Sequence, residues 1–206
     1  MMYLNYRSLG DVIMKKMDVV FLLDRSGSMY DSVCDTIGGF NSYLDSLKDK
    51  DDIKVTTILF DNEYEVLYER KSIKSVEKLT TKDYYVRGST ALYDAIGLTI
   101  NNLESKIKNN KVLFIITTDG YENSSKEYNK EKIKSMIEKH SNWEFIYMGA
   151  NIDSYKEGAN IGIRCDNIAN YEKGKKGTNK MFEALKCASN MVYEDRLSSD
   201  WKSNLE

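Results

Sequence analysis

Two short apolar runs, each ending in an aspartate, constrain the fold of this chain more than any other feature. Residues 17–23 (MDVVFLL) precede Asp24, and residues 111–118 (KVLFIITT) precede Asp119. Continuous apolar runs of this length, rich in β-branched residues, are typical of strands buried on both faces of a parallel sheet. Both aspartates are therefore expected at the carboxyl ends of central strands.

Further strands and helices are predicted to alternate along the chain. Other apolar runs predict strands at 53–60, 143–150 and, as a short edge strand, 65–69. Apolar residues spaced three or four apart predict helices at 33–47, 92–107, 126–140 and 178–193. Strands that alternate with helices form a mainly parallel sheet covered on both faces. We therefore predict the α/β class, with an open, doubly wound sheet.

The stretch 151–177 is less regular. Residues 153–162 predict a short helix, 163–171 a last strand, and 172–178 (EKGKKGT) a basic linker whose lysines are expected in a solvated loop. A chain of 206 residues suits a single domain. We assign that domain to 17–195, with an N-terminal extension at 1–16 and a C-terminal tail at 196–206.

Composition excludes several classes of function. The 30 Lys and Arg against 32 Asp and Glu leave a net charge of −2, which disfavours direct binding to nucleic acid. No apolar run reaches the roughly 18 residues of a membrane helix, and the N-terminus has no secretory pattern, so a cytoplasmic protein is expected. Three cysteines without a CxxC spacing indicate neither a disulfide framework nor a zinc knuckle, and we expect them to be buried.

Candidate ligands for a metal gather at the predicted strand ends. In an open α/β sheet, the functional crevice lies beyond the carboxyl ends of the strands. Asp24 is followed there by Ser26 and Ser28, Asp119 by Gly120, and the loop VRGST brings Thr90 to the start of a helix. Carboxylates and hydroxyls favour Mg²⁺, Mn²⁺ or Ca²⁺ over Zn²⁺ or Cu²⁺. Two carboxylates roughly neutralise a divalent ion, which can then accept one more anionic ligand.

These residues resemble the von Willebrand factor type A (VWA) domain and its metal-ion-dependent adhesion site. The family's DxSxS triplet is matched by Asp24, Ser26 and Ser28, its isolated threonine by Thr90, and its later aspartate by Asp119. The resemblance covers the strand and helix order from about residue 17 to 193. It implies a Rossmann-like, mainly parallel sheet with one antiparallel edge strand, helices on both faces and Mg²⁺ at its top.

The resemblance also implies a function. In the family the two serines coordinate the ion, the threonine and aspartates act directly or through water, and a carboxylate of a partner protein completes the coordination. We therefore expect a non-enzymatic, metal-dependent protein-binding module, which resembles the small free-standing type found in bacteria and phages. Tyr30, Tyr93 and Tyr121 follow the three metal-binding segments and are predicted to form an aromatic rim for a partner.

Alternatives remain open at this point. The serines, the threonine and Asp119 could act only as helix caps and turn residues. A Mg²⁺-dependent phosphohydrolase of the haloacid dehalogenase type also has an aspartate after its first strand, but it needs a second aspartate where this chain has Ser26. A nucleotide-binding role would need a glycine-rich phosphate loop of the GxGxxG or GxxxxGKS/T pattern, which is not present.

Overall fold

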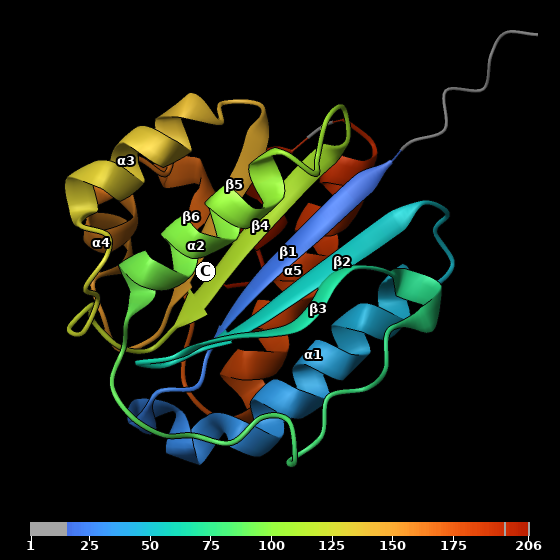
Figure 1. The fold of residues 1–206 in the computed structure, drawn as a ribbon. Coiled ribbons are helices and arrows are strands. Elements are labelled where there is room, and N and C mark those ends of the chain that lie inside the picture. The colour runs from blue at the N-terminus through green and yellow to red at the C-terminus, as the bar shows by residue number, and fades with distance from the viewer. Residues whose placement is uncertain (1–15, 196, 206) are drawn as a thin grey trace, which may run out of the picture.

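A computed structural model describes residues 16–195 and 197–205, so nearly all of the N-terminal extension predicted at 1–16 lies outside the described residues. Six strands form one sheet in the order β3-β2-β1-β4-β5-β6 (Figure 1). Their bounds are β1 Met17–Asp24, β2 Ile53–Phe60, β3 Tyr64–Ser72, β4 Lys111–Thr118, β5 Trp143–Gly149 and β6 Ile168–Asn170. Only β3 is antiparallel to its neighbour among these strands, which confirms the predicted fold class.

Helices cover both faces of the sheet (Figure 1). The α-helices are α1 Val33–Leu47, α2 Leu92–Glu104, α3 Lys130–Lys139, α4 Ser154–Asn160 and α5 Lys175–Tyr193. Apolar residues of α1 and α5 pack with one set of strand side chains, and those of α2 and α3 with the other set. Strands β1 and β4 in between are buried on both sides, as their uninterrupted apolar sequences require.

Aromatic rings fill the core between β1, α1 and α5. The ring of Phe21 meets those of Phe40 and Tyr43 edge-on, with centroids 5.2 and 5.4 Å away, and stacks on Phe182 at 6.1 Å. Gly39 allows α1 and α5 to approach closely, because a Cβ there would lie 2.1 Å from the Phe182 ring. The two helices are thus packed firmly against β1, which carries Asp24 at its end.

Several boundaries differ from the sequence-based prediction. Helix α3 begins at Lys130 instead of 126, because Asp94 accepts hydrogen bonds from the backbone N–H groups of 126–128 and holds them in a turn. The last strand shrinks from 163–171 to β6, after a 3₁₀ turn at Cys165–Asn167. Helix α5 begins inside the predicted linker, so Lys175 and Lys176 are helical. The expectation of buried cysteines is wrong, since Cys34 and Cys165 are exposed and Cys187 is half-buried.

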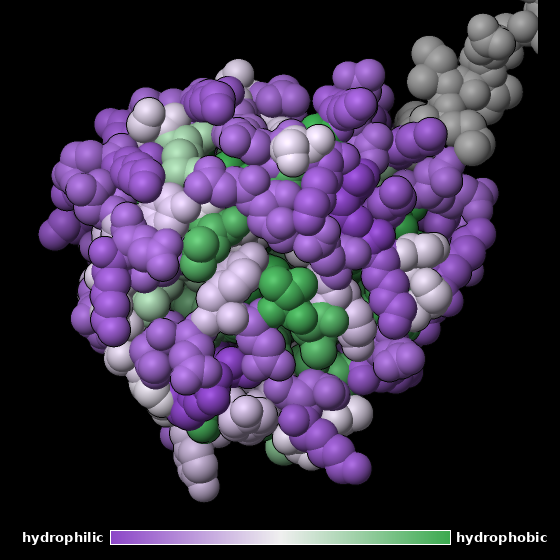
Figure 2. All heavy atoms as spheres, viewed as in Figure 1, coloured by the Kyte–Doolittle hydropathy of each residue, from purple (hydrophilic) through white to green (hydrophobic). Residues whose placement is uncertain are grey.

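The surface is mainly polar, with a limited apolar area near the centre of the face seen in Figure 2. No helix among the described residues combines the length and the apolarity needed to cross a membrane. Beyond residue 195, the side chain of Trp201 is buried in the core, and its Nε1 donates to the carbonyl of Asp166 at 2.9 Å. Residues assigned to a tail therefore contribute to the packing of the domain.

Candidate metal centre

Asp24 is the last residue of β1 and is held from several directions. Strand β1 pairs with β4 in a register that places Leu23 opposite Thr117, so the two strands end side by side. Asp24 Oδ2 accepts from the hydroxyl of Thr118 at 2.6 Å, and Oδ1 accepts from the backbone N–H of Ser26 at 2.7 Å. The hydroxyl of Tyr84 donates to the Asp24 carbonyl at 2.5 Å. The carboxylate is therefore fixed in orientation.

Burial also changes the chemistry of Asp24, which is only 1% exposed. Burial raises the pKa of its carboxyl from 3.8 to about 6, although the hydrogen bonds from Thr118 and Ser26 oppose the increase. The environment thus disfavours the charged form. A nearby divalent cation would reverse that balance, because opposite charge stabilises the carboxylate.

The two serines lie between the two aspartates. Ser26 Oγ is 3.1 Å from Ser28 Oγ, and the Ser28 hydroxyl donates to Asp119 Oδ1. Ser26 is buried, whereas Ser28 is exposed, so the group of hydroxyls opens to solvent through Ser28. A serine that donates its proton to a carboxylate keeps its lone pairs available to a cation.

Thr90 approaches the same place from the loop before α2. A Cβ on Gly120 would lie 2.9 Å from Thr90 Oγ1 and 3.6 Å from Ser28 Oγ, so the two hydroxyls converge over this glycine. Thr90 is held there by Asn123: its N–H donates to Asn123 Oδ1 at 2.9 Å, and the Asn123 N–H donates back to the Thr90 carbonyl at 3.0 Å. The structure thus brings all five predicted site residues to one end of the sheet.

One oxygen of Asp119 is paired with an ammonium group and accepts no hydrogen bond from the described residues. The Asp119 side chain is fully buried, and Oδ2 forms an ion pair with the ammonium of Lys173 that lacks the geometry of a hydrogen bond. A buried carboxylate oxygen without a hydrogen bond is costly unless a cation or water satisfies it. This oxygen and the cradle over Gly120 fit a hard divalent cation.

The donor set contains only oxygen. Within residues 16–195 and 197–205, no three His, Cys, Asp or Glu side chains gather as a metal-binding group, so a metal here would need the hydroxyls as well as the two carboxylates. Oxygen ligands of this kind suit Mg²⁺, Mn²⁺ and Ca²⁺. The helix-cap alternative explains less, since Ser26 forms no side-chain cap bond to the turn that follows it, and the N-cap of α2 is Ala91 and not Thr90.

A known protein family shares the sequence pattern of this chain. The sequence model of the von Willebrand factor type A domain matches residues 18–161, which is more than half of the chain. The chain belongs to this family. No curated protein matches the sequence significantly.

Solved structures share the fold of this VWA domain at low sequence identity. Proximal thread matrix protein 1 of the mussel byssus is 16% identical with a TM-score of 0.61, over 87% of this chain and 46% of that protein. The pilus adhesin SpaC of Lactobacillus rhamnosus GG, in its open conformation, is 14% identical with a TM-score of 0.66, over 88% of this chain and 30% of that protein. The manganese-loaded TRAP protein of Plasmodium vivax is 20% identical with a TM-score of 0.62, over 84% of this chain and 74% of that protein. The chain spans less than half the length of the first two of these proteins.

Two contacts around the site of this VWA domain have no signal in the sequence. Arg25, which is fully buried, pairs through Nε with Asp61 Oδ2 at 2.9 Å, and Arg87 pairs with the same oxygen at 2.7 Å. The N–H of Arg87 also donates to the Arg25 carbonyl at 2.9 Å. Asp61 thereby joins the loop that carries the serines to the loop that carries Thr90. The ion pair of Lys173 with Asp119 is the second such contact.

The three tyrosines of the predicted rim differ in exposure. Tyr30 is 74% exposed and Tyr121 is 52% exposed, whereas Tyr93 is half-buried on the first turn of α2. The N–H of Tyr93 donates to Glu122 at 2.9 Å, which ties α2 to the loop after Asp119. Tyr30 and Tyr121 can therefore reach a partner through their rings, and the rim itself stays a prediction.

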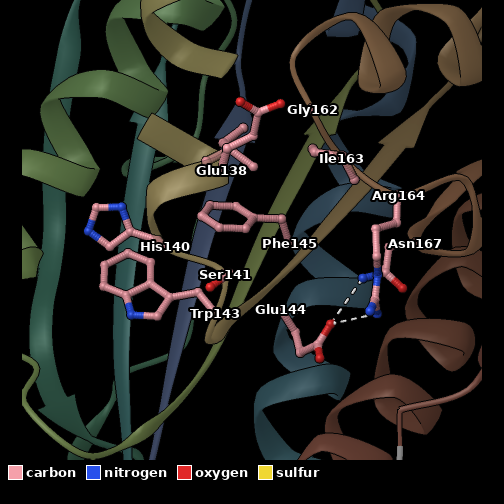
Figure 3. A pocket seen from close by; sticks show the side chains of 11 residues that line it. Glu138, His140, Ser141, Trp143, Glu144, Phe145, Gly162, Ile163, Arg164 and Asn167 are labelled. Carbon is pink, nitrogen blue, oxygen red and sulfur yellow. Dashed lines mark hydrogen bonds and ion pairs between the residues drawn. The ribbon is translucent and has the colours of Figure 1, made fainter. Parts of the chain in front are cut away.

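A separate hollow lies far from these residues. It has a volume of about 360 Å³ and is lined by the end of α3, the start of β5 and the segment before β6 (Figure 3). Glu144 closes one side by accepting from Arg164 and Asn167, both at 3.1 Å. Trp143, which lines this hollow, is at the amino end of β5. The hollow therefore lies at the opposite end of the sheet from Asp24 and Asp119.

Proposed function

We propose that this VWA domain binds a divalent cation, in the first place Mg²⁺, and uses it to engage a carboxylate of a partner protein. The proposed ligands and orienting groups are Asp24, Ser26, Ser28, Thr90 and Asp119, an intact metal-ion-dependent adhesion site. The observation that carries the proposal is the convergence of the Thr90 and Ser28 hydroxyls over Gly120, beside the Asp119 carboxylate.

Each residue has a distinct role in this proposal. The hydroxyl oxygens of Ser26, Ser28 and Thr90 supply neutral ligands. The two aspartates orient hydroxyls or bound water and balance the ion's charge, as outer ligands do in other metal sites. Mg²⁺ retains water and prefers six oxygen ligands, so an exchangeable position for an external carboxylate is chemically reasonable. The bound ion would supply the electrophile that this carboxylate binds.

Relatives support a metal at this place. The TRAP protein of Plasmodium vivax was solved loaded with manganese, and the mussel proximal thread matrix protein 1 was solved with zinc in its MIDAS motif. Because Mn²⁺ and Mg²⁺ share oxygen ligands and octahedral geometry, we propose that Mn²⁺ can replace Mg²⁺ in this chain, and that Ca²⁺, which also takes oxygen ligands, can do so as well.

The proposed output is binding and not catalysis. A phosphohydrolase of the haloacid dehalogenase type needs an acid two residues after its nucleophile. The residue there is Ser26, whose hydroxyl lies next to that of Ser28. No other observation favours a phosphohydrolase. The cytoplasmic location and the bacterial or phage type stay predictions from the sequence.

Calorimetric titration of chelator-stripped protein tests the metal proposal. We expect one site for Mg²⁺ and for Mn²⁺ in the wild type, and loss of binding in Ser26→Ala and Asp119→Asn. Ser46→Ala is the matched control, because this exposed serine on α1 donates only to the nearby Tyr43 carbonyl. Equal binding by the wild type and Ser26→Ala would contradict the assignment of ligands.

A second experiment tests the carboxylate partner. Immobilised peptides that contain a single Asp or Glu, with Asn or Gln versions beside them, are exposed to the protein with Mg²⁺ or with EDTA. We expect retention only with both the metal and the carboxylate present, and no retention of Ser26→Ala. Retention that persists in EDTA would argue against a metal-mediated contact.

A further inference from the structure

Lys173 places an ammonium group inside the candidate metal centre. The residue lies between β6 and α5, and its Nζ forms an ion pair with Asp119 Oδ2. The same Nζ donates to the backbone carbonyl of Ser28 at 3.0 Å. One lysine from a distant part of the chain thus contacts two of the five residues that are proposed to hold the cation.

The ion pair differs from an ordinary surface pair. The Asp119 side chain is fully buried, while that of Lys173 is 28% exposed. Surface pairs contribute little because water screens both charges, but here one partner has no contact with water. Removal of the ammonium would leave a buried carboxylate without a counter-charge, which is strongly unfavourable. In the absence of metal, Lys173 therefore serves as the cation of the site.

A divalent ion bound between Ser28 and Asp119 would stand within a few ångströms of this ammonium. Like charges at such a separation repel each other strongly where burial lowers the effective dielectric constant. The ion and the ammonium would also seek the same oxygen, because Asp119 Oδ1 already accepts from Ser28 and Oδ2 has no hydrogen bond. Both cations cannot be fully satisfied by one carboxylate oxygen.

Lys173 has the freedom to leave. Its side chain is partly exposed, and four methylene groups allow the ammonium to reach water while the stem stays packed. Loss of the single bond to the Ser28 carbonyl is then the main local cost, and water can replace the lysine at an exposed residue.

We propose that Lys173 is a built-in competitor of the metal, whose ammonium leaves Asp119 Oδ2 when a divalent cation binds and thereby sets the metal affinity. This inference rests on the proposed function. It gives the chain a metal site that never lacks a positive charge, since one cation replaces the other. It also means that the affinity for metal is lower than the ligand set alone would provide.

Calorimetry on three chelator-stripped proteins tests the competition. Wild type, Lys173→Met and Lys176→Met are titrated with Mg²⁺ and Mn²⁺; Lys176 is the control, because it is an exposed lysine on the first turn of α5. We expect Lys173→Met to bind both ions roughly tenfold more tightly, and Lys176→Met to match the wild type. Lys173→Gln, which keeps a polar end group, serves if Lys173→Met folds poorly.

A labelling experiment separates displacement from a general effect of charge. The rate at which an amine-reactive reagent modifies each lysine is measured by peptide mass spectrometry, with Mg²⁺ and with EDTA. We expect Mg²⁺ to raise the rate at Lys173 and to leave that at Lys176 unchanged. Tighter binding by Lys173→Met with an unchanged labelling rate in the wild type would show that the ammonium stays in place, which overturns the inference.

The remaining outcomes are also distinguishable. Equal or weaker binding by Lys173→Met, with binding by the wild type intact, overturns the competition and leaves the proposed metal site standing. Absence of binding in both the wild type and Lys173→Met overturns the metal site and the competition together. Binding by Lys173→Met alone supports both, because it shows ligands that the lysine keeps occupied.

Discussion

Thr118 and Asp24, the last residues of the adjacent strands β4 and β1, are joined by a buried hydrogen bond of 2.6 Å from the threonine hydroxyl to the carboxylate. The sheet itself therefore positions the first aspartate of the candidate site. Asp24 is the last residue of its strand, as the sequence predicts, and its side chain is buried. Its replacement must be chosen with the partners of both oxygens in mind.

Two substitutions of Asp24 are expected to separate stability from metal binding. Asp24→Ala leaves the Thr118 hydroxyl and the Ser26 N–H without their acceptor, so we expect a loss of about 1–3 kcal/mol in the free energy of unfolding. Asp24→Asn keeps a side chain of the same size with an acceptor oxygen, in a place that already disfavours charge. Its loss of unfolding free energy should therefore be smaller than that of Asp24→Ala. Urea denaturation in EDTA measures this. Both variants should lose Mg²⁺, and wild-type affinity in Asp24→Asn would refute the role of Asp24.

The cradle over Gly120 predicts a sharp effect of one methyl group. Gly120→Ala would place a Cβ 2.9 Å from Thr90 Oγ1, so the threonine hydroxyl must shift and the Mg²⁺ affinity should fall at least about tenfold. Gly38→Ala is the control, since a Cβ there meets nothing within 4 Å. In the middle of α1 this control should stabilise the fold by about 0.5–1 kcal/mol. Calorimetry and urea denaturation measure both effects.

The predicted rim concerns the partner and not the metal. Tyr30→Ala and Tyr121→Ala remove exposed rings, so each should change the free energy of unfolding by less than about 0.5 kcal/mol and leave Mg²⁺ binding unaltered. Retention on the single-carboxylate peptides should nevertheless weaken. Tyr155→Ala, at another exposed tyrosine, is the control. If the two rim variants are retained on the peptides as strongly as the control Tyr155→Ala, the rim has no part in recognition.

Trp201 predicts how far the folded unit extends. Its side chain is 1% exposed and its Nε1 bonds to the Asp166 carbonyl, so Trp201→Ala should cost about 3–5 kcal/mol of unfolding free energy. Trp201→Phe keeps most of the buried area and should cost less. Urea denaturation of the two variants would reveal a dispensable tail if neither differed from the wild type.

The sequence by itself determined the strands, the order of the helices and the five candidate site residues. Each of these signals is local: an apolar run such as 111–118 indicates burial on both faces, and Asp24, Ser26 and Ser28 follow their strand directly. Parallel strands then bring their ends to one edge of the sheet, so side chains such as Asp24 and Asp119 meet without any detail of packing.

Only the tertiary structure decided which groups surround those residues. Lys173 lies 145 positions from Ser28, and its neighbours in the sequence suggest a solvated loop. Asp61 joins two metal-site loops through Arg25 and Arg87, which no spacing indicates. Contacts of this kind depend on where flexible, charged side chains end after the sheet and helices have packed. Periodicity records which faces are buried, whereas the pairing of charges at a site follows from the completed fold.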